Sequence, residues 1–336
     1  MNILFTCAGR RNYLVNYFRE ALCGDGIIIG TDASDLAPAL AECDKKIVVP
    51  RVSDDAYIPA ILDICVKNNV KLVVSLNDLD LPVLAANADK FKEIGVVLSV
   101  SDKSIIDICF DKFETEKFLK SIGLKTTTSY YSPAEALDAV CKGKASFPMI
   151  VKPRWGSGSI RLEVVENIEQ LELAYNLSKG KILSTILGRV SQTDIERCLV
   201  IQPALRGDEY GMDVVNNFDC ENVSVFVKRK IRMRAGETDM AQSCRNEKIE
   251  EIGRVIAKNL RHKGMLDCDL FWDGKEAYIM DMNPRFGGGY PFTHCAGVDV
   301  PKAYLHWAKG ESAPADCFNF IPDMTFSKCD KLVRVK

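Results

Sequence analysis

Short apolar runs alternate with amphipathic stretches over the first third of the chain. The apolar runs have the length of buried strands, and they span residues 3–7, 26–30, 46–49, 71–75 and 96–100. The stretches between them, at 14–22 and 57–68, repeat apolar side chains at helical spacing. Strands that alternate with helices pair in parallel, because each helix carries the chain back across the sheet. The pattern predicts an open parallel α/β lobe.

We place the end of this lobe at residue 105, and the pattern changes after a further helix that ends at Gly123. From Phe147 onward the strand candidates are longer and alternate apolar with polar positions, which is typical of antiparallel sheets with one covered face. The helices predicted in this part of the chain span residues 111–123, 168–177 and 249–260. We therefore expect an α+β region with antiparallel pairing, followed at 311–336 by a surface tail without a sustained period.

Composition narrows the class of partner. Charged residues make up 27% of the chain, hydrophobic residues 47%, and the formal net charge is −2. This balance gives no indication of nucleic acid or a membrane surface as a partner. No apolar run approaches the ~20 residues of a membrane-spanning helix, and the N-terminus lacks the order of a signal peptide. We expect a cytoplasmic protein, and the sequence leaves open whether it forms a homodimer.

The cysteines give no sign of a metal site. The chain has 13 of them, with no CxxC pair and no zinc-like spacing. Cysteines that are odd in number and unclustered are typical of reduced thiols. We expect them to be packed in the core.

A glycine-rich segment follows the first long strand candidate, in the run FPMIVKPRWGSGS at 147–159. Lys152 ends the strand and supplies a compact positive charge. The loop after it consists of Gly156, Ser157, Gly158 and Ser159. Glycines allow backbone N–H groups to approach a phosphate closely, so we interpret this loop as a phosphate flap, with an ordinary hairpin turn as the alternative. The spacing matches neither the Walker pattern nor GxGxxG.

A second candidate is the run CLVIQPALRGDEYGMDVV at 198–215. It reads as a strand, a break near Pro203 and a second strand opened by Gly207. Alternation places Glu209 and Asp213 on the same face of the second strand. Glu209 suits the hydroxyls of a ribose, although a solvated strand residue is the alternative. The backbone groups that could meet an adenine edge belong to Gln202, Pro203, Ala204 and Leu205.

Oxygen-bearing side chains gather in the run LDCDLFWDGKEAYIMDMNPRFGGG at 266–289. Asp281 and Asn283 are two residues apart and share a face of their strand. Carboxylate and amide oxygens are the ligands that Mg²⁺ takes in proteins. Asp269 joins them from the preceding strand only if the connection has an odd number of residues, because a two-residue Asp-Gly turn would place Asp269 and Asp281 on opposite faces. We therefore predict a connection of three or five residues, and a magnesium site formed by the three side chains.

Other polar groups are candidates for substrate contacts and catalysis. Arg285, just past the metal ligands, can stabilise charge on a transferring phosphoryl group. His294 is interpreted as a packed residue. The candidate substrate contacts are Arg10 after the first strand, Arg232 and Arg234 in the basic run KRKIRMRAG, and Gly287 and Gly288. For the basic run, a solvated strand face is the alternative.

With these residues in this order, the chain resembles the ATP-grasp superfamily. The runs DMNPRFGGGYP and RAGET are most similar to one module of the carbamoyl-phosphate synthase large subunit. The runs CAGRRNYLV, GTDASDLAPA and DICFDKFETEKFLKSIG are similar to single-module ligases of that kind. The resemblance extends from residue 1 to about residue 310. It implies a fold of mixed class, α/β and α+β, in which an N-terminal lobe at 1–105 precedes two lobes at 106–200 and 201–310 that clamp ATP.

The resemblance also implies roles for individual residues. Lys112 and Lys152 match the two ATP lysines, Glu209 the ribose-binding glutamate, and Asp281 and Asn283 the ligands of Mg²⁺ or Mn²⁺. Two positions depart from the family pattern, since Asp281 stands where a longer glutamate is usual and Gln202 replaces the glutamate of the adenine hinge.

The activity that this resemblance implies is an ATP-dependent carboxylate–amine ligase that forms an amide through an acyl phosphate. Lys152, Asn283 and Arg285 would be its catalytic residues. Its partners would be a small carboxylate and a small amine. Two alternatives stay open: phosphorylation of bicarbonate or carbamate, and a nucleotide-binding subunit without turnover.

Overall fold

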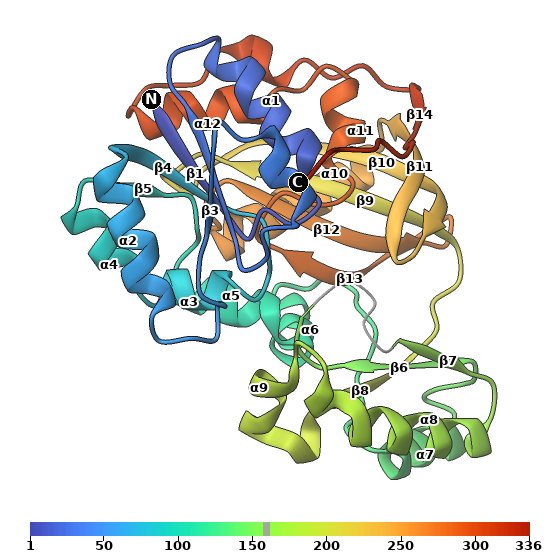
Figure 1. The fold of residues 1–336 in the computed structure, drawn as a ribbon. Helices are drawn as coiled ribbons and strands as arrows, with labels where there is room; N and C mark the ends of the chain where they lie inside the picture. Colours follow the sequence, from blue (N-terminus) through green and yellow to red (C-terminus); the bar gives the residue numbers. More distant parts are fainter. Residues whose placement is uncertain (157–161) are drawn as a thin grey trace.

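The computed structural model of the chain describes residues 1–156 and 162–336 (Figure 1). The N-terminal lobe is a parallel sheet of five strands in the order β3-β2-β1-β4-β5, which confirms the predicted α/β lobe. Its strands are β1 (Asn2–Thr6), β2 (Ile28–Asp32), β3 (Lys45–Val48), β4 (Val70–Ser75) and β5 (Val97–Leu98). Its helices are α1 (Asn12–Leu22), η1 (Pro38–Glu42), α2 (Tyr57–Lys67), α3 (Leu81–Ala85) and α4 (Ala88–Glu93).

Helices cover both faces of this sheet, which explains why its strands read as continuous apolar runs. Successive side chains of a strand point to opposite faces. Phe5 of β1 accordingly packs with Phe18 of α1, whereas Leu4 belongs to the cluster that contains Ile61 of α2. All four side chains are fully buried.

The second sheet is antiparallel and has six strands in the order β13-β12-β9-β10-β11-β14. The strands are β9 (Asp208–Asn216), β10 (Asn222–Arg234), β11 (Glu237–Cys244), β12 (Met265–Trp272), β13 (Ala277–Asn283) and β14 (Thr325–Ser327). Helix α10 (Glu247–Leu260) packs Ile249 and Ile256 against Met212 and Val214 of β9. Glu209 and Asp213, at the alternate positions of β9, therefore belong to the opposite face of the sheet, as predicted. Strand β14 comes from the region expected to be a tail, and pairs with β11.

A smaller lobe contains the antiparallel sheet β7-β6-β8. Figure 1 shows it beside the edge of the large sheet formed by β13. Its strands are β6 (Met149–Pro153), β7 (Glu163–Val165) and β8 (Leu199–Pro203). Its helices are α7 (Pro133–Cys141), α8 (Ile168–Lys181), η2 (Ile182–Ser184), α9 (Gly188–Ser191) and η3 (Gln192–Arg197). Helices α5 (Lys103–Phe110) and α6 (Lys112–Ser121) connect this lobe to the N-terminal one. The carboxylate of Asp111 caps α6 by accepting a hydrogen bond from the Phe113 N–H.

The last helices return to the N-terminal lobe. They are α11 (Tyr290–Cys295), α12 (Val300–Ala308) and the short η4 (Ala315–Phe318). Phe286 and Tyr304 pack edge-on against Phe18 of α1, so the large sheet and the N-terminal lobe share one core. His294 stacks on Tyr17 with ring centroids 3.6 Å apart, which confirms it as a packed residue.

Two expectations from composition can be compared with the structure. Within the described residues, no helix is long and apolar enough to cross a membrane. All 13 cysteines are free, as predicted. The prediction that the cysteines are packed in the core is correct for only five of them. The buried cysteines are Cys65, Cys109, Cys198, Cys268 and Cys317.

Candidate active site

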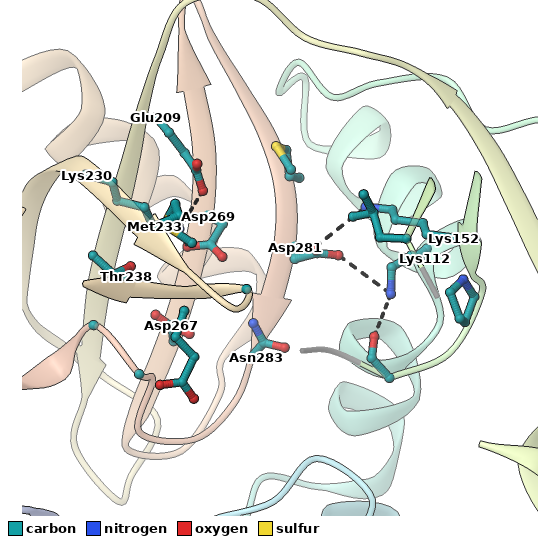
Figure 2. A pocket seen from close by; sticks show the side chains of 18 of the residues that line it. Lys112, Lys152, Glu209, Lys230, Met233, Thr238, Asp267, Asp269, Asp281 and Asn283 are labelled. Carbon is teal, nitrogen blue, oxygen red and sulfur yellow. Dashed lines mark hydrogen bonds and ion pairs between the residues drawn. The ribbon is translucent and has the colours of Figure 1, made fainter. Parts of the chain in front are cut away.

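A cavity of about 370 Å³ lies between the small sheet and the face of the large sheet opposite α10. Its walls come from distant parts of the sequence: Arg11 at the start of α1, Lys112 of α6, Lys152 of β6 and Asp281 of β13. Figure 2 shows Lys112 and Lys152 on one side of this space and the oxygen-bearing side chains of the large sheet on the other. The fold therefore brings together the two groups that the sequence placed in one site.

Lys112 and Lys152 meet the carboxylate of Asp281 across the cavity. Their ammonium nitrogens lie 3.8 and 3.7 Å from its two oxygens (Figure 2). Burial alone would raise the pKa of Asp281, but Lys152 and Lys112 outweigh it and hold this pKa below its ordinary value. Both lysine side chains are almost fully buried. The site thus concentrates two cations around one carboxylate, which suits a ligand that carries several negative charges.

The predicted flap is represented by its first residue. The Gly156 carbonyl accepts a hydrogen bond of 2.6 Å from Lys112, and the φ of Gly156 is +83°, a left-handed conformation that favours glycine. Ser157, Gly158 and Ser159 lie outside the described residues. Lys152 and Gly156 both line the cavity.

Asp269 lies directly opposite Asp281 on the paired strands β12 and β13, so the two share a face. The predicted reason for this shared face, a connection of three or five residues between the strands, was wrong. Trp272 pairs with Ala277, and the connection has the four residues 273–276 rather than three or five. An irregularity between Asp269 and Leu270 leaves Met280 as an extra residue on β13. This bulge restores the parity that an even-numbered connection would lose.

Asp267 also belongs to this group, although the sequence analysis missed it. It pairs with Asn283 on the neighbouring strand and lines the cavity. Its position two residues before Asp269 was the available signal, since strand residues two apart share a face. The four oxygen-bearing side chains therefore form two facing pairs on adjacent strands (Figure 2).

Lys230 of β10 is a second residue that the sequence analysis missed. Its ammonium lies 2.7 Å from Glu209 and 2.6 Å from Asp269. Burial would lower the pKa of Lys230, but the two carboxylates raise it above its ordinary value, so the side chain stays charged. Gly211 of β9 pairs with Lys228 of β10 and with Asp269 of β12. A Cβ on Gly211 would lie 3.1 Å from the Lys228 side chain and 3.6 Å from that of Lys230. The missing side chain leaves room for both lysines.

The residues present fit a magnesium ion that binds together with phosphates. Within residues 1–156 and 162–336, no group of three or more His, Cys, Asp or Glu side chains is arranged to hold a metal by itself. Mg²⁺ in nucleotide sites commonly uses only one or two carboxylates and completes its octahedron with water and phosphate oxygens. Asp281, Asn283 and Asp269 supply oxygens of that type on one face of the sheet.

Arg285 links the large sheet to the N-terminal lobe. It donates hydrogen bonds of 2.9 Å to Asp78 and 3.1 Å to Asp267. Burial would lower its pKa, but the two carboxylates raise it above its ordinary value. Arg285 lines the cavity as expected, and it also fixes the position of Asp267.

Two groups of the segment assigned to adenine have partners within the protein. The segment's residues are Gln202, Pro203, Ala204 and Leu205, and in the described part of the chain none of them lines the cavity. The buried Gln202 amide donates to the Ser129 hydroxyl (2.8 Å), and the Ala204 N–H donates to the Pro148 carbonyl (2.9 Å). These two donors are therefore occupied within the protein, and the assignment of this segment's backbone groups to an adenine edge stays a prediction.

Three arginines assigned to the substrate also lie elsewhere. Arg10 is exposed and is not part of the cavity wall, which Arg11 joins instead. Arg232 and Arg234 bind Asp239, and Arg234 also binds Asp330 of the C-terminal segment.

A bulge in β10 explains why Arg232 and Arg234 do not line the cavity. Lys228 and Lys230 line the cavity, so simple alternation would bring Arg232 and Arg234 to the same side. The register of β10 with β11 shifts between Lys230 and Arg232, and this bulge brings Met233 into the cavity wall in their place.

The glycine run after β13 has a packing role as well. Gly288 lines the cavity, whereas Gly287 does not. A Cβ on Gly287 would lie 2.2 Å from the Asp267 carboxylate carbon, so glycine is required for the close approach of these two segments. Of the two glycines assigned to the substrate, only Gly288 faces the cavity.

Comparisons with known proteins match two segments of the chain. Residues 3–99 match the family described as PylC-like, N-terminal domain. Residues 196–332 match the family described as ATP-grasp in the biosynthetic pathway with Ter operon. The carbamoyl phosphate synthase large chain of Clostridium acetobutylicum is 23% identical over 238 residues, which cover 67% of this chain and 21% of that protein. The matched regions cover 21%, 52% and 56% of the full lengths of three curated relatives, so this chain spans only part of each of them.

Solved structures share the fold over almost the whole chain. The biotin carboxylase of Campylobacter jejuni superposes with a TM-score of 0.73 at 15% identity, covering 95% of this chain and 73% of that one. The L-amino acid ligase of Bacillus licheniformis gives a TM-score of 0.70 at 17% identity, covering 96% of this chain and 79% of that one.

Proposed function

This chain belongs to the ATP-grasp superfamily, and on that premise we propose that it is an ATP-dependent carboxylate–amine ligase that releases ADP and phosphate. One observation carries the proposal. Lys112 and Lys152 approach Asp281 from the other side of the cavity, at 3.8 and 3.7 Å. A triphosphate placed there would meet two buried ammonium groups on one side and metal-binding oxygens on the other.

The remaining walls suit the rest of a nucleotide. Ile150, Leu187 and Met280 give the cavity an apolar surface, which accommodates an aromatic base. Glu209 faces the same space, and its contact with Lys230 orients a carboxylate that can accept hydrogen bonds from ribose hydroxyls. Asp281 and Asn283, with Asp269, would hold Mg²⁺, which supplies positive charge to the phosphates when it is bound.

The proposed reaction has two steps, and the protein contributes alignment and charge. A carboxylate oxygen of the first substrate attacks the γ-phosphorus, and the bond from that phosphorus to ADP breaks. The amine nitrogen of the second substrate then attacks the acyl carbon, the bond from this carbon to the phosphate oxygen breaks, and phosphate leaves. The nitrogen loses one proton, so the products are ADP, phosphate and an amide. Lys152 stabilises the charge that develops on the transferred group.

The proposal is tested by measuring ADP release from MgATP with pairs of small carboxylates and amines, followed by mass spectrometry of the product. We expect release that requires both substrates, and a product whose mass equals the sum of the two minus water. ADP release that needs no amine, or no release with any pair while MgATP binds, would contradict the ligase function.

A second candidate function is phosphorylation of bicarbonate or carbamate, which the sequence match to a carbamoyl phosphate synthase large chain favours. It predicts that ADP release requires bicarbonate. Amine-dependent release of phosphate at full rate in bicarbonate-free buffer would rule it out.

A further inference from the structure

An ion pair joins the two segments that carry Lys112 and Lys152. Arg154 comes just after β6, two residues beyond Lys152, and Asp111 directly precedes Lys112 at the start of α6. The Arg154 Nε donates to both oxygens of Asp111 at 2.9 Å, and its Nη2 lies 2.7 Å from Oδ2. The two side chains are only 15% and 11% exposed, so water screens this pair less than it screens a surface ion pair.

The same carboxylate also fixes the start of α6. The Asp111 Oδ1 accepts a hydrogen bond of 3.0 Å from the Phe113 N–H, and a capping bond of this kind stabilises the first turn of a helix. Lys112 is the first residue of that turn. Asp111 therefore connects the guanidinium of Arg154 with the backbone that carries Lys112.

Backbone pairing runs beside the ion pair. The Lys112 N–H donates to the Arg154 carbonyl at 3.1 Å, and the Arg154 N–H donates to the Cys198 carbonyl at 2.9 Å. Asp111 and Trp155 form an antiparallel bridge between the same two segments. Lys112 lies on a helix that leads out of the N-terminal lobe, and these bonds attach its backbone to the small sheet.

Neighbouring groups hold the Arg154 guanidinium in one orientation. It lies 4.5 Å from the centroid of the Trp155 ring and 5.3 Å from that of Phe113. Its Nη1 lies 3.1 Å from the carboxylate of Asp194 in η3. A planar guanidinium can stack on rings while its fork binds a carboxylate, whereas a lysine ammonium offers only a point charge. The surroundings of Arg154 therefore require an arginine and not merely a cation.

We propose that Arg154 is a positioning residue for ATP: through Asp111 it sets the place of Lys112 beside Lys152, so that the two ammonium groups bind the phosphates together. The inference rests on the proposed ligase function. Among the described residues, those that line the cavity include neither Arg154 nor Asp111, so both act through Lys112. Groups that are held in place before binding reduce the entropy cost of recognition.

A double-mutant cycle on nucleotide binding tests this role. Calorimetry measures the affinity for magnesium and the non-hydrolysable β,γ-imido analogue of ATP in four proteins: wild type, Arg154→Gln, Lys112→Met and the double variant. Arg154→Gln should weaken binding by about tenfold in the presence of Lys112. In the Lys112→Met background it should change the affinity by less than about twofold. A residue that only supports the small lobe would weaken binding by the same factor in both backgrounds.

Further variants separate the ion pair from the helix cap. Asp111→Asn keeps a good capping residue but removes the charge that Arg154 binds, and it should also weaken binding by about tenfold. Arg197→Gln is the control, because Arg197 is an exposed arginine of the same lobe whose guanidinium lies 4.9 Å from the Tyr131 ring, and it should keep wild-type affinity. If circular dichroism shows that Arg154→Gln does not fold, Arg154→Lys takes its place in the cycle, since lysine keeps the charge and lacks the fork.

The outcomes distinguish this inference from the ligase function. Wild-type affinity in Arg154→Gln or in Asp111→Asn, or an equal effect of Arg154→Gln with and without Lys112, would overturn the inference. In that case the ligase function stands if the wild-type protein binds the analogue and releases ADP only with both substrates. A wild-type protein that does not bind the analogue contradicts the ligase function itself, and the inference with it.

Discussion

Asp269 lies directly opposite Asp281 because Met280 is an extra residue on β13. Without this bulge, the four-residue connection between the strands would turn the two carboxylates to opposite faces of the sheet. One residue of register therefore decides whether the large sheet offers an oxygen-rich face to Lys112 of α6 and Lys152 of β6.

Lys152→Ala should reduce ADP release by about 100-fold or more, because it removes a buried positive charge, 3.7 Å from Asp281, beside the proposed position of the transferred phosphoryl group. The fold should persist, as judged by circular dichroism. Lys142→Ala is the control, since Lys142 is an exposed residue just past α7 that pairs with Asp138, and it should keep wild-type turnover. Full activity of Lys152→Ala would contradict the assignment of this lysine to ATP.

Asn283→Ala should increase the magnesium concentration needed for half-maximal activity by about tenfold or more, since one oxygen ligand is lost. Titration of ADP release against Mg²⁺ at constant ATP measures this change. An unaltered magnesium dependence would show that Asn283 is not a ligand.

Lys230→Met should destabilise the fold by about 2–3 kcal/mol, because Glu209 and Asp269 would lose their shared counter-charge in a largely buried place. Urea unfolding measures the difference. Arg229→Met is the matched control on the same strand, because Arg229 is exposed and lies 3.8 Å from its partner Asp208, so its loss should change stability by less than ~0.5 kcal/mol. Equal stability of the two variants would refute the structural role of Lys230.

His262 should make stability fall in mild acid. Its imidazole is fully buried, and this burial lowers its pKa from the ordinary 6.5 to about 4. The unfolded chain binds a proton below pH 6.5 and the folded protein does not until about pH 4, so stability is lost as the pH falls through this window. The loss from this group alone should reach about 3 kcal/mol at pH 4.

The measurement compares urea unfolding of the wild-type protein with that of His262→Gln between pH 7 and pH 4. Other acid-sensitive groups cancel in the difference, provided that the variant folds at pH 7. The gap in stability between the two proteins should narrow as the pH falls. A gap that is constant with pH would mean that His262 does not titrate as described.

Several features of the site could be predicted from the sequence because they depend on local periodicity. Alternation along β9 placed Glu209 and Asp213 on one face, and the same rule paired Asp281 with Asn283. Lys152 comes near the end of an apolar strand within a run of thirteen residues, and this pattern can be recognised from those residues alone. The same rule would have identified Asp267, two residues before Asp269.

Other features depend on which strand pairs with which, and in what register. The bulge in β10 turns Arg232 and Arg234 away from the cavity and Met233 toward it, although alternation predicted the reverse. The three residues of β14 form a strand only because β11 offers them an edge. Arg11 lines the cavity and Arg10 does not, because of the path that the chain takes into α1.

The sequence by itself determined the parallel and antiparallel lobes, and it singled out Lys152 and the pair Asp281 and Asn283 for the proposed site, since each follows from apolar periodicity or from a compact motif. Only the tertiary structure decided that Met280 restores the alignment of Asp269 with Asp281, and that Lys230 joins Glu209 to Asp269. These relationships join residues on different strands or in different lobes. Their geometry is set by pairing register and packing over long separations in sequence, and no local pattern encodes it.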